Sequence, residues 1–384
     1  MDGRKKEVKE MKKLEKIKDI IIYKDDFYNS FPNVVRLKDD RLMVSFRNAP
    51  EWQYRYHDVT HGDPCSRGVY VLSDDEGQTW SPRPFVIYDD YLYGVQDPCL
   101  NLLRDGTIVS SFFMWKAWEA GDFPGDPEKS HRVFGRYCLE LKDLHTVRSH
   151  DGGRTWEEPV LVDFPGKKAM NSARGNMVEL EDGSLLFAVA SYGHEKENRR
   201  VIVLKSMDRG RNWVRLYDIP RVEEAALMGE PNLYRAPSGK LVCMIRTHFE
   251  KENKTLYGGS DASLSPMHVS VSDDDGKTWS MPRATKYTSP SPFEAIRLES
   301  GRVVMTYGHR YPPYGIKAVY MDGEMEELDT AEELLIREDG VNHDLGYTRS
   351  VQLKNGDILV VYYIFSPEDG IRHIAGTLLR ETKG

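Results

Sequence analysis

One short motif occurs four times in this chain and constrains its fold more than any other feature. Each copy follows the pattern Ser-x-Asp-x-Gly-x-Thr/Asn-Trp, and the copies are Ser73–Trp80, Ser149–Trp156, Ser206–Trp213 and Ser272–Trp279. In such a segment the Asp side chain can accept backbone N–H groups of its own loop, Gly supplies a positive φ, and Trp fills the space beside a hairpin. Repeats at this level of detail indicate an architecture built from similar units.

A second repeat sets the number of units. Six tight turns, each between two strand-like runs, recur at intervals of about 55 to 77 residues; their Gly positions are Asp40, Gly106, Gly183, Gly239, Gly301 and Gly356. The Trp-terminated motif follows the first four turns, and Met321-Asp322-Gly323 and Pro367–Gly370 take its place in the last two units. Each unit therefore supplies two hairpins. We predict an all-β fold, a six-bladed β-propeller with four-stranded antiparallel blades, over residues 25–384.

The first 24 residues have a different composition. They are rich in Lys and Glu, and Val8, Met11, Leu14 and Ile17 fall on one stripe of a helix. We expect residues 1–24 to form a short charged helical extension outside the ring. No apolar signal-peptide core or small-residue cleavage site is visible in this segment, so we expect a cytoplasmic protein.

Composition excludes several classes of function. The 384 residues include 53 Lys and Arg against 61 Asp and Glu, a formal charge of −8, which disfavours a nucleic-acid or anionic-membrane partner. The four cysteines, Cys65, Cys99, Cys138 and Cys243, lack zinc-site spacing, and Asp273–Asp275 lacks the downstream Glu of a calcium loop. We therefore expect no metal and no cofactor.

Equivalent positions on six innermost strands should form a ring around the central channel. Nine residues before each turn Gly position, the chain carries Phe31, Asp97, Arg174, Glu230, Pro292 and Tyr347. On the second strands, seven or nine residues after that position, stand Arg47, Arg246, His248 and Arg310, with Trp115 and Tyr192 in other blades. Ionisable groups at phased positions predict a site at one mouth of the channel, and several arginines favour recognition of a carboxylate.

Glu230 and Tyr347 suggest a mechanism. A phenol has a pKa near 10, so it needs a neighbouring carboxylate to take its proton before it becomes a nucleophile. A Tyr avoids charge repulsion where the reacting carbon of the substrate carries its own carboxylate. The alternative is a buried Tyr bonded to a structural Glu.

The general acid for the leaving group remains open between several residues. The loop from His57 to Pro64 is polar and lies between the first inner hairpin and the first Trp-terminated motif. Asp63 and Asp58 are the candidate acids in this loop, with His57 or His61 as alternatives. Turn chemistry alone is another interpretation of the His-Gly-Asp-Pro sequence.

From about residue 25 onward the chain resembles the sialidase (neuraminidase) superfamily, whose hallmark is this Asp-box motif in a six-bladed propeller. The resemblance implies that Tyr347 is the nucleophile and Glu230 its activating carboxylate. It also implies that Arg246 and Arg310 are the second and third members of a carboxylate-binding arginine triad, and that Arg47 is similar to the arginine closing the first inner hairpin. By the same resemblance, Asp97 contacts substituents of the substrate and Asp63 or Asp58 is the acid/base.

The chain departs from the family at the first arginine of the triad. The family has Arg-Ile-Pro on the first inner strand, where this chain has Ser30-Phe31-Pro32. Arg174 or Arg349 can substitute from another blade. We expect an exo-acting, retaining glycoside hydrolase of sialidase type whose partner is a glycan ending in an acidic sugar. The alternatives are a uronic-acid polysaccharide lyase and a non-catalytic carbohydrate-binding propeller.

Overall fold

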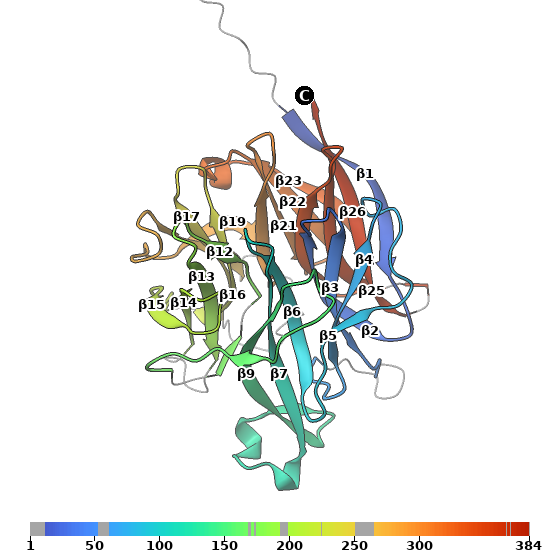
Figure 1. Cartoon of the computed structure of the whole chain (residues 1–384), viewed down its shortest axis with the longest axis vertical. Helices are drawn as coiled ribbons and strands as arrows, with labels where there is room; N and C mark the ends of the chain where they lie inside the picture. Colours follow the sequence, from blue (N-terminus) through green and yellow to red (C-terminus); the bar gives the residue numbers. More distant parts are fainter. Residues whose placement is uncertain are drawn as a thin grey trace, which may run out of the picture.

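The computed structural model describes residues 12–52, 61–167, 170–172, 174–192, 199–223, 225–249, 265–365, 367–368 and 370–383. Strands dominate these residues and form six antiparallel sheets arranged as the blades of a propeller (Figure 1). Helical structure in the described ranges is limited to short 3₁₀ turns, η1 (Ala120–Asp122), η2 (Pro127–Lys129) and η5 (Glu326–Asp329). In the same ranges, no helix is long and apolar enough to span a membrane.

Each blade is a path of four strands that runs from the channel to the outer edge. Blade one consists of β2 (Tyr28–Arg36), β3 (Leu42–Ala49), β4 (Arg67–Ser73) and β5 (Phe85–Tyr88). Blade two consists of β6 (Gly94–Leu102), β7 (Ile108–Glu119), β9 (Tyr137–Ser149) and β10 (Val160–Leu161), with β8 (His131–Val133) beside β9. Blade three consists of β11 (Met170–Ser172) and β12 (Met177–Glu179), which both pair with β13 (Leu185–Tyr192), followed by β14 (Arg200–Ser206) and β15 (Val214–Asp218). Blade four consists of β16 (Ala225–Arg235), β17 (Leu241–Phe249), β18 (Pro266–Ser272) and β19 (Arg283–Thr288). Blade five consists of β20 (Phe293–Arg297), β21 (Val303–His309), β22 (Tyr314–Met321) and β23 (Glu333–Gly340). Blade six consists of β24 (Gly346–Gln352), β25 (Ile358–Phe365), β26 (Arg372–Lys383) and β1 (Lys12–Tyr23).

The six turns expected from the sequence join the first and second strands of the blades. Residues at all six Gly positions have φ between 71° and 95°, the region that Gly adopts without cost. In the first turn the N–H of Leu37 donates to the carbonyl of Arg41 at 2.8 Å, and Leu103 and Thr107 repeat this bond in the second at 2.9 Å. The spacing of these turns therefore predicted the blades correctly.

The four Ser-x-Asp turns share one hydrogen-bond pattern. In the first, Asp75 accepts the backbone N–H of Thr79 at 2.8 Å and its hydroxyl at 2.5 Å, while Ser73 accepts the N–H of Gly77 at 2.8 Å. Hydrogen bonds from Thr79 lower the pKa of Asp75 to about 2. The Asp therefore closes its own loop at one end of the blade, away from the channel.

The hydrophobic core lies mainly between neighbouring blades. One cluster joins Val35 and Met43 of blade one to Leu100 and Ile108 of blade two. The Trp residues that end the Ser-x-Asp motifs take part in such clusters: Trp213 packs in the cluster between blades two and three. Burial of apolar surface between blades is the main force that holds the ring together.

The helical extension expected for residues 1–24 is wrong for residues 12–23. These residues form β1, which pairs antiparallel with β26 and completes the sixth blade, so the two ends of the chain close the ring together (Figure 1). Leu14 and Ile22 are buried in this strand, whereas Ile17, placed on the expected helical stripe, is 40% exposed. A helix there would leave the edge of β26 unpaired, and the β-branched run Ile20–Ile22 suits a strand. Val8 and Met11 lie outside the described residues.

Candidate active site

A backbone bulge recurs on four of the innermost strands at the position nine residues before the turn. The strand register skips there, and Phe31, Asp97, Glu230 and Tyr347 all have positive φ, between 43° and 55°. This conformation is costly for residues other than Gly, and bulges re-aim side chains beside active sites. Four of the six ring positions expected from the sequence therefore share the same bulged backbone conformation.

Tyr347, Glu230 and Arg246 form the centre of the site. The hydroxyl of Tyr347 donates to Glu230 Oε1, and Arg246 Nη1 pairs with Glu230 Oε2 and donates to the Tyr347 hydroxyl at 3.1 Å. Burial, and then the charge of Glu230, raises the pKa of Tyr347 well above its ordinary value. Burial alone would raise the pKa of Glu230, but the charge of Arg246 and the hydrogen bond from Tyr347 lower this pKa below its ordinary value. Glu230 is therefore an ionised acceptor for the proton of a neutral phenol.

His248 supports this centre from the same strand as Arg246. Its Nε2 accepts a hydrogen bond from Arg246 Nε at 3.0 Å. Burial, and then the charges of Arg246 and Arg310, lower the pKa of His248 well below its ordinary value. The neutral imidazole is thus an acceptor that orients the guanidinium of Arg246.

Two further arginines flank the ring of Tyr347. The guanidinium carbons of Arg174 and Arg310 lie 5.2 and 5.1 Å from its centroid. Arg174 also donates to the backbone carbonyls of Pro32 and Tyr347, and Arg310 donates to the carbonyl of Leu345 at 2.9 Å. Arg174 therefore links bulges of blades one and six, and both guanidinium groups lie within cation–π distance of the ring.

Asp97 adds a second buried carboxyl group to the site. Burial raises its pKa to about 7, even though Arg174, Arg47 and Arg246 lower it, and the charge of Glu230 raises it further. At neutral pH Asp97 is therefore only partly ionised. Since Arg174, Arg246 and Arg310 all contact Tyr347, positive charge exceeds negative charge around the phenol.

The other two expected arginines have different neighbours. Arg47 on β3 is fully buried, with its guanidinium carbon 5.2 Å from the ring of Tyr28. Arg349 lies two residues beyond Tyr347 on β24, with its Nε 3.8 Å from Glu294 Oε1. It lines a cavity of about 360 Å³, to which all six blades contribute, together with Asn101 and Asn176. Arg349 therefore belongs to a deeper layer of the channel.

Where the family has its first arginine this chain has Ser30, and the apolar ring of Phe31 follows it. Ser30 is fully buried, and the ring of Phe31 lies edge-on to Tyr347 with 4.6 Å between centroids. The clamp implied by the resemblance is thus incomplete on blade one.

Of the two candidate acids, Asp63 lies within the described residues and Asp58 does not. Asp63 is buried; Oδ2 accepts the indole N–H of Trp52, and Oδ1 accepts the backbone N–H of Cys65 at 2.7 Å. Both oxygens therefore hold the conformation of its loop. Asp58 and His57 lie outside the described residues.

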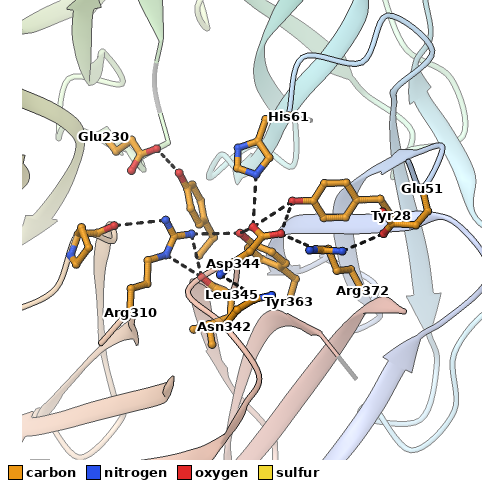
Figure 2. A network of polar contacts seen from close by, with 12 residues as sticks. Tyr28, Glu51, His61, Glu230, Arg310, Asn342, Asp344, Leu345, Tyr363 and Arg372 are labelled. Atoms are coloured by element: carbon orange, nitrogen blue, oxygen red, sulfur yellow. Dashed lines mark hydrogen bonds and ion pairs between the residues drawn. The ribbon is translucent and has the colours of Figure 1, made fainter. Parts of the chain in front are cut away.

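A network around Asp344 was not anticipated from the sequence as a candidate site. Asp344 accepts hydrogen bonds from Tyr28 at 2.9 Å and Tyr363 at 2.7 Å, pairs with Arg372, and lies 3.4 Å from Nε2 of His61 (Figure 2). Its members come from separate segments of blades one and six. No spacing in the sequence signals such a cluster, because Asp344 precedes a strand in an otherwise ordinary turn.

Among the described ranges, no group of three or more His, Cys, Asp or Glu side chains is placed to hold a metal ion. The chemistry available to the site is that of a phenol, carboxyl groups, guanidinium groups and imidazoles.

Residues 68–360 match the model of the BNR repeat-like domain, and the chain belongs to this family of propellers. It is similar to a solved protein of unknown function from Dyadobacter fermentans DSM 18053, with 30% identity and a TM-score of 0.83 over 96% of this chain and 99% of the other. A comparison with curated protein sequences gave no match.

More distant structures share the fold. NanB sialidase from Streptococcus pneumoniae is 15% identical with a TM-score of 0.64, over 94% of this chain and 70% of the other. The GH93 α-L-arabinofuranosidase of Fusarium graminearum, solved with arabinobiose, is 13% identical with a TM-score of 0.62, over 95% of this chain and 98% of the other. These likenesses support the six-bladed propeller expected from the repeats.

Proposed function

We propose that this protein is an exo-acting, retaining glycoside hydrolase of sialidase type that releases a terminal acidic sugar. Tyr347 is the nucleophile, Glu230 takes its proton, and Arg246 and Arg310 bind the carboxylate of the substrate. Arg47, Arg174 and His248 support this pocket, Asp97 contacts substituents of the sugar, and Arg349 lies deeper in the channel. Glycosidases are also among the proteins that share the fold, which supports the class of reaction.

The contact between Tyr347 and Glu230 carries the proposal. As Glu230 accepts the phenol proton, the phenol oxygen bonds to the anomeric carbon and the glycosidic C–O bond breaks. The leaving oxygen keeps the bonding electrons and takes a proton from a general acid. Water then attacks the anomeric carbon, the bond to Tyr347 breaks, and the phenol regains its proton, so two inversions retain the configuration.

The excess of positive charge supports an acidic sugar. Three arginines contact Tyr347, whereas Asp97 is only partly ionised at neutral pH. Such a pocket stabilises an anion, and a neutral nucleophile approaches a carboxylated carbon without repulsion. Because blade one lacks the first arginine of the family, we propose acidic sugars as the substrate class, of which sialic acid is one member.

The test is a panel of fluorogenic methylumbelliferyl glycosides. It contains an α-sialoside, a β-glucuronide and, as the neutral comparison, an α-L-arabinofuranoside. We expect turnover of an acidic glycoside that Tyr347→Phe and Glu230→Gln abolish, with ¹H NMR showing retention. Undiminished turnover by Tyr347→Phe refutes the nucleophile, and turnover of the arabinofuranoside alone refutes the acidic substrate.

A uronic-acid lyase is the second candidate, favoured by Ser30 at the first arginine position. In a lyase the arginines neutralise the uronate and a Tyr or His removes the acidified proton. A product that absorbs in the near ultraviolet distinguishes this reaction from hydrolysis. A sugar that raises Tm without any product indicates a non-catalytic binding propeller instead.

A further inference from the structure

Building on the proposed hydrolase function, we propose that His61, oriented by the buried carboxylate of Asp344, is the general acid and base of the reaction. The pair lies at the boundary of blades one and six, beside the Tyr347 bulge. His61 is the catalytic residue of the pair, because its side chain is the exposed member, and Asp344 is a positioning residue.

The two side chains differ in exposure as an acid and its orienting group should. The side chain of His61 is 44% exposed, whereas that of Asp344 is 7% exposed, and the distance between Nε2 and Oδ1 is 3.4 Å. Figure 2 shows the imidazole above the carboxylate with Nε2 turned toward it. A hydrogen bond at one ring nitrogen fixes the tautomer and leaves the other nitrogen, Nδ1, to exchange protons with a substrate.

Asp344 is held rigidly and in its charged form. Burial alone would raise the pKa of Asp344, but the hydrogen bond from His61 and the charge of Arg372 hold this pKa well below its ordinary value. The hydroxyls of Tyr28 and Tyr363 donate to the same carboxylate at 2.9 and 2.7 Å. Asp344 therefore remains a charged acceptor that can hold one ring nitrogen of His61.

His61 is separated from the nucleophile by a single aromatic ring. The ring of Phe31 lies edge-on to His61 at 5.1 Å and to Tyr347 at 4.6 Å. Phe31 is itself buried, so it spaces the phenol and the imidazole apart without offering its face to solvent. The phenol of Tyr347 and the imidazole of His61 thus border on the same ring, which brings them into one site.

Among the described residues of this loop, His61 is the candidate proton donor. Asp63 has both oxygens engaged in its own loop. His131 on β8 and His343 before β24 also face His61, and burial is the main cause that lowers the pKa of each. The lowered pKa values favour the neutral forms of these two imidazoles. Among the described residues, Arg372 pairs with Asp344, and the charge of Arg310 lowers the pKa of His343 further.

The proton transfers balance over the two steps. As the bond from the anomeric carbon to the leaving oxygen breaks, that oxygen takes the Nδ1 proton of the His61 imidazolium. In the second step the neutral Nδ1 accepts a proton from the attacking water while Tyr347 departs from the anomeric carbon. His61 returns to its starting state, and no further reactant is needed.

The experiment compares two leaving groups. Wild type and His61→Asn are assayed for kcat/KM on methylumbelliferyl α-sialoside, which has a good leaving group, and on sialyllactose, which has a poor one. We expect His61→Asn to lose about 100- to 10,000-fold on sialyllactose and less than about 10-fold on the aryl sialoside, because only the alkoxide needs a proton. Asp344→Asn should move the same ratio in the same direction by a smaller factor.

A matched control is available in His150. Its side chain is 47% exposed and lies 2.8 Å from Glu157, far along the sequence on the second Ser-x-Asp turn. His150→Asn should leave both kcat/KM values and Tm unchanged. His61→Asn with wild-type turnover of sialyllactose, or with equal losses on the two substrates at unchanged Tm, refutes the role of His61 while the hydrolase stands. If the wild-type protein cleaves neither these probes nor the β-glucuronide, both the proposed hydrolase function and the role of His61 are refuted.

Discussion

Nε of Arg246 donates a hydrogen bond to Nε2 of His248 at 3.0 Å, and the two side chains leave the same strand two residues apart. Arg246 turns its Nη1 toward Glu230 and the Tyr347 hydroxyl. Because the buried imidazole is neutral, it accepts this hydrogen bond without adding a second positive charge beside the guanidinium. His248 thus fixes the donor that stabilises both the activating carboxylate and the phenol.

Removing the acceptor of His248 should therefore slow the reaction more than it weakens the fold. We expect His248→Phe to lower kcat/KM about 10-fold, equivalent to one lost hydrogen bond of about 1 to 1.5 kcal/mol. His248→Gln, which keeps an acceptor oxygen, should recover part of this loss. The measurement is kcat/KM together with Tm for both variants, and a parallel drop in Tm and activity would argue for a packing role only.

The hydroxyl of Tyr347 gives the most direct test of the centre. Tyr347→Phe removes one oxygen from a residue whose ring contacts are apolar or cation–π, so the fold should persist. We expect kcat to fall by at least about 1,000-fold with Tm nearly unchanged. Tyr362→Phe on the same blade is the control: its hydroxyl contacts Thr377 and Arg337, outside the site. Equal activity of the two variants would contradict the nucleophile assignment.

Asp97 should make the use of an acidic substrate sensitive to pH. Its pKa is about 7, so raising the pH through this value adds a negative charge to the pocket. Repulsion between this charge and an anionic sugar should lower kcat/KM about 10-fold between pH 6 and 8. We expect Asp97→Asn to abolish this decline. A decline that persists unchanged in Asp97→Asn would assign the titration to another group.

The repeats predicted the fold because their turns depend on local chemistry. A positive φ at Gly106 and Gly356, or the side-chain bonds of Asp75, needs only neighbouring residues. Strand β1 escaped prediction because its partner, β26, lies at the other end of the sequence. A local pattern of charged and apolar residues does not show such long-range pairing.

The candidate site was partly predictable for the same reason. Phasing from the turns identified Glu230 and Tyr347, which the structure brings into contact. Their bulged backbone was not expected, because strict alternation of strand residues does not reveal a register shift. His61 and Asp344 meet only after blades one and six have closed, so no sequence spacing connects them.

The Trp residues of the four Ser-x-Asp motifs should differ in their contribution to stability. Trp279 is buried and donates its indole N–H to the carbonyl of Gly276 at 3.0 Å, whereas Trp80 is only partly buried. We expect Trp279→Ala to cost about 3 to 5 kcal/mol and Trp80→Ala clearly less. Urea unfolding of the two variants measures the difference. Equal costs would mean that the burial of the Trp does not set its contribution to stability.

Glu294 should make the wild-type protein less stable as the pH rises. It lies buried beside Arg349, and burial raises its pKa from 4.5 to about 7, against the opposing charge of Arg349. The folded protein keeps this proton up to about pH 7, while the unfolded chain releases it near 4.5, so the free energy of unfolding falls between these two pH values and then stays level. The loss amounts to at most about 3 kcal/mol. Glu294→Gln has no proton to release, so its Tm should rise relative to wild type from pH 5 to pH 8, as measured by calorimetry. A constant difference in Tm over this range would show that Glu294 is already ionised in the folded protein.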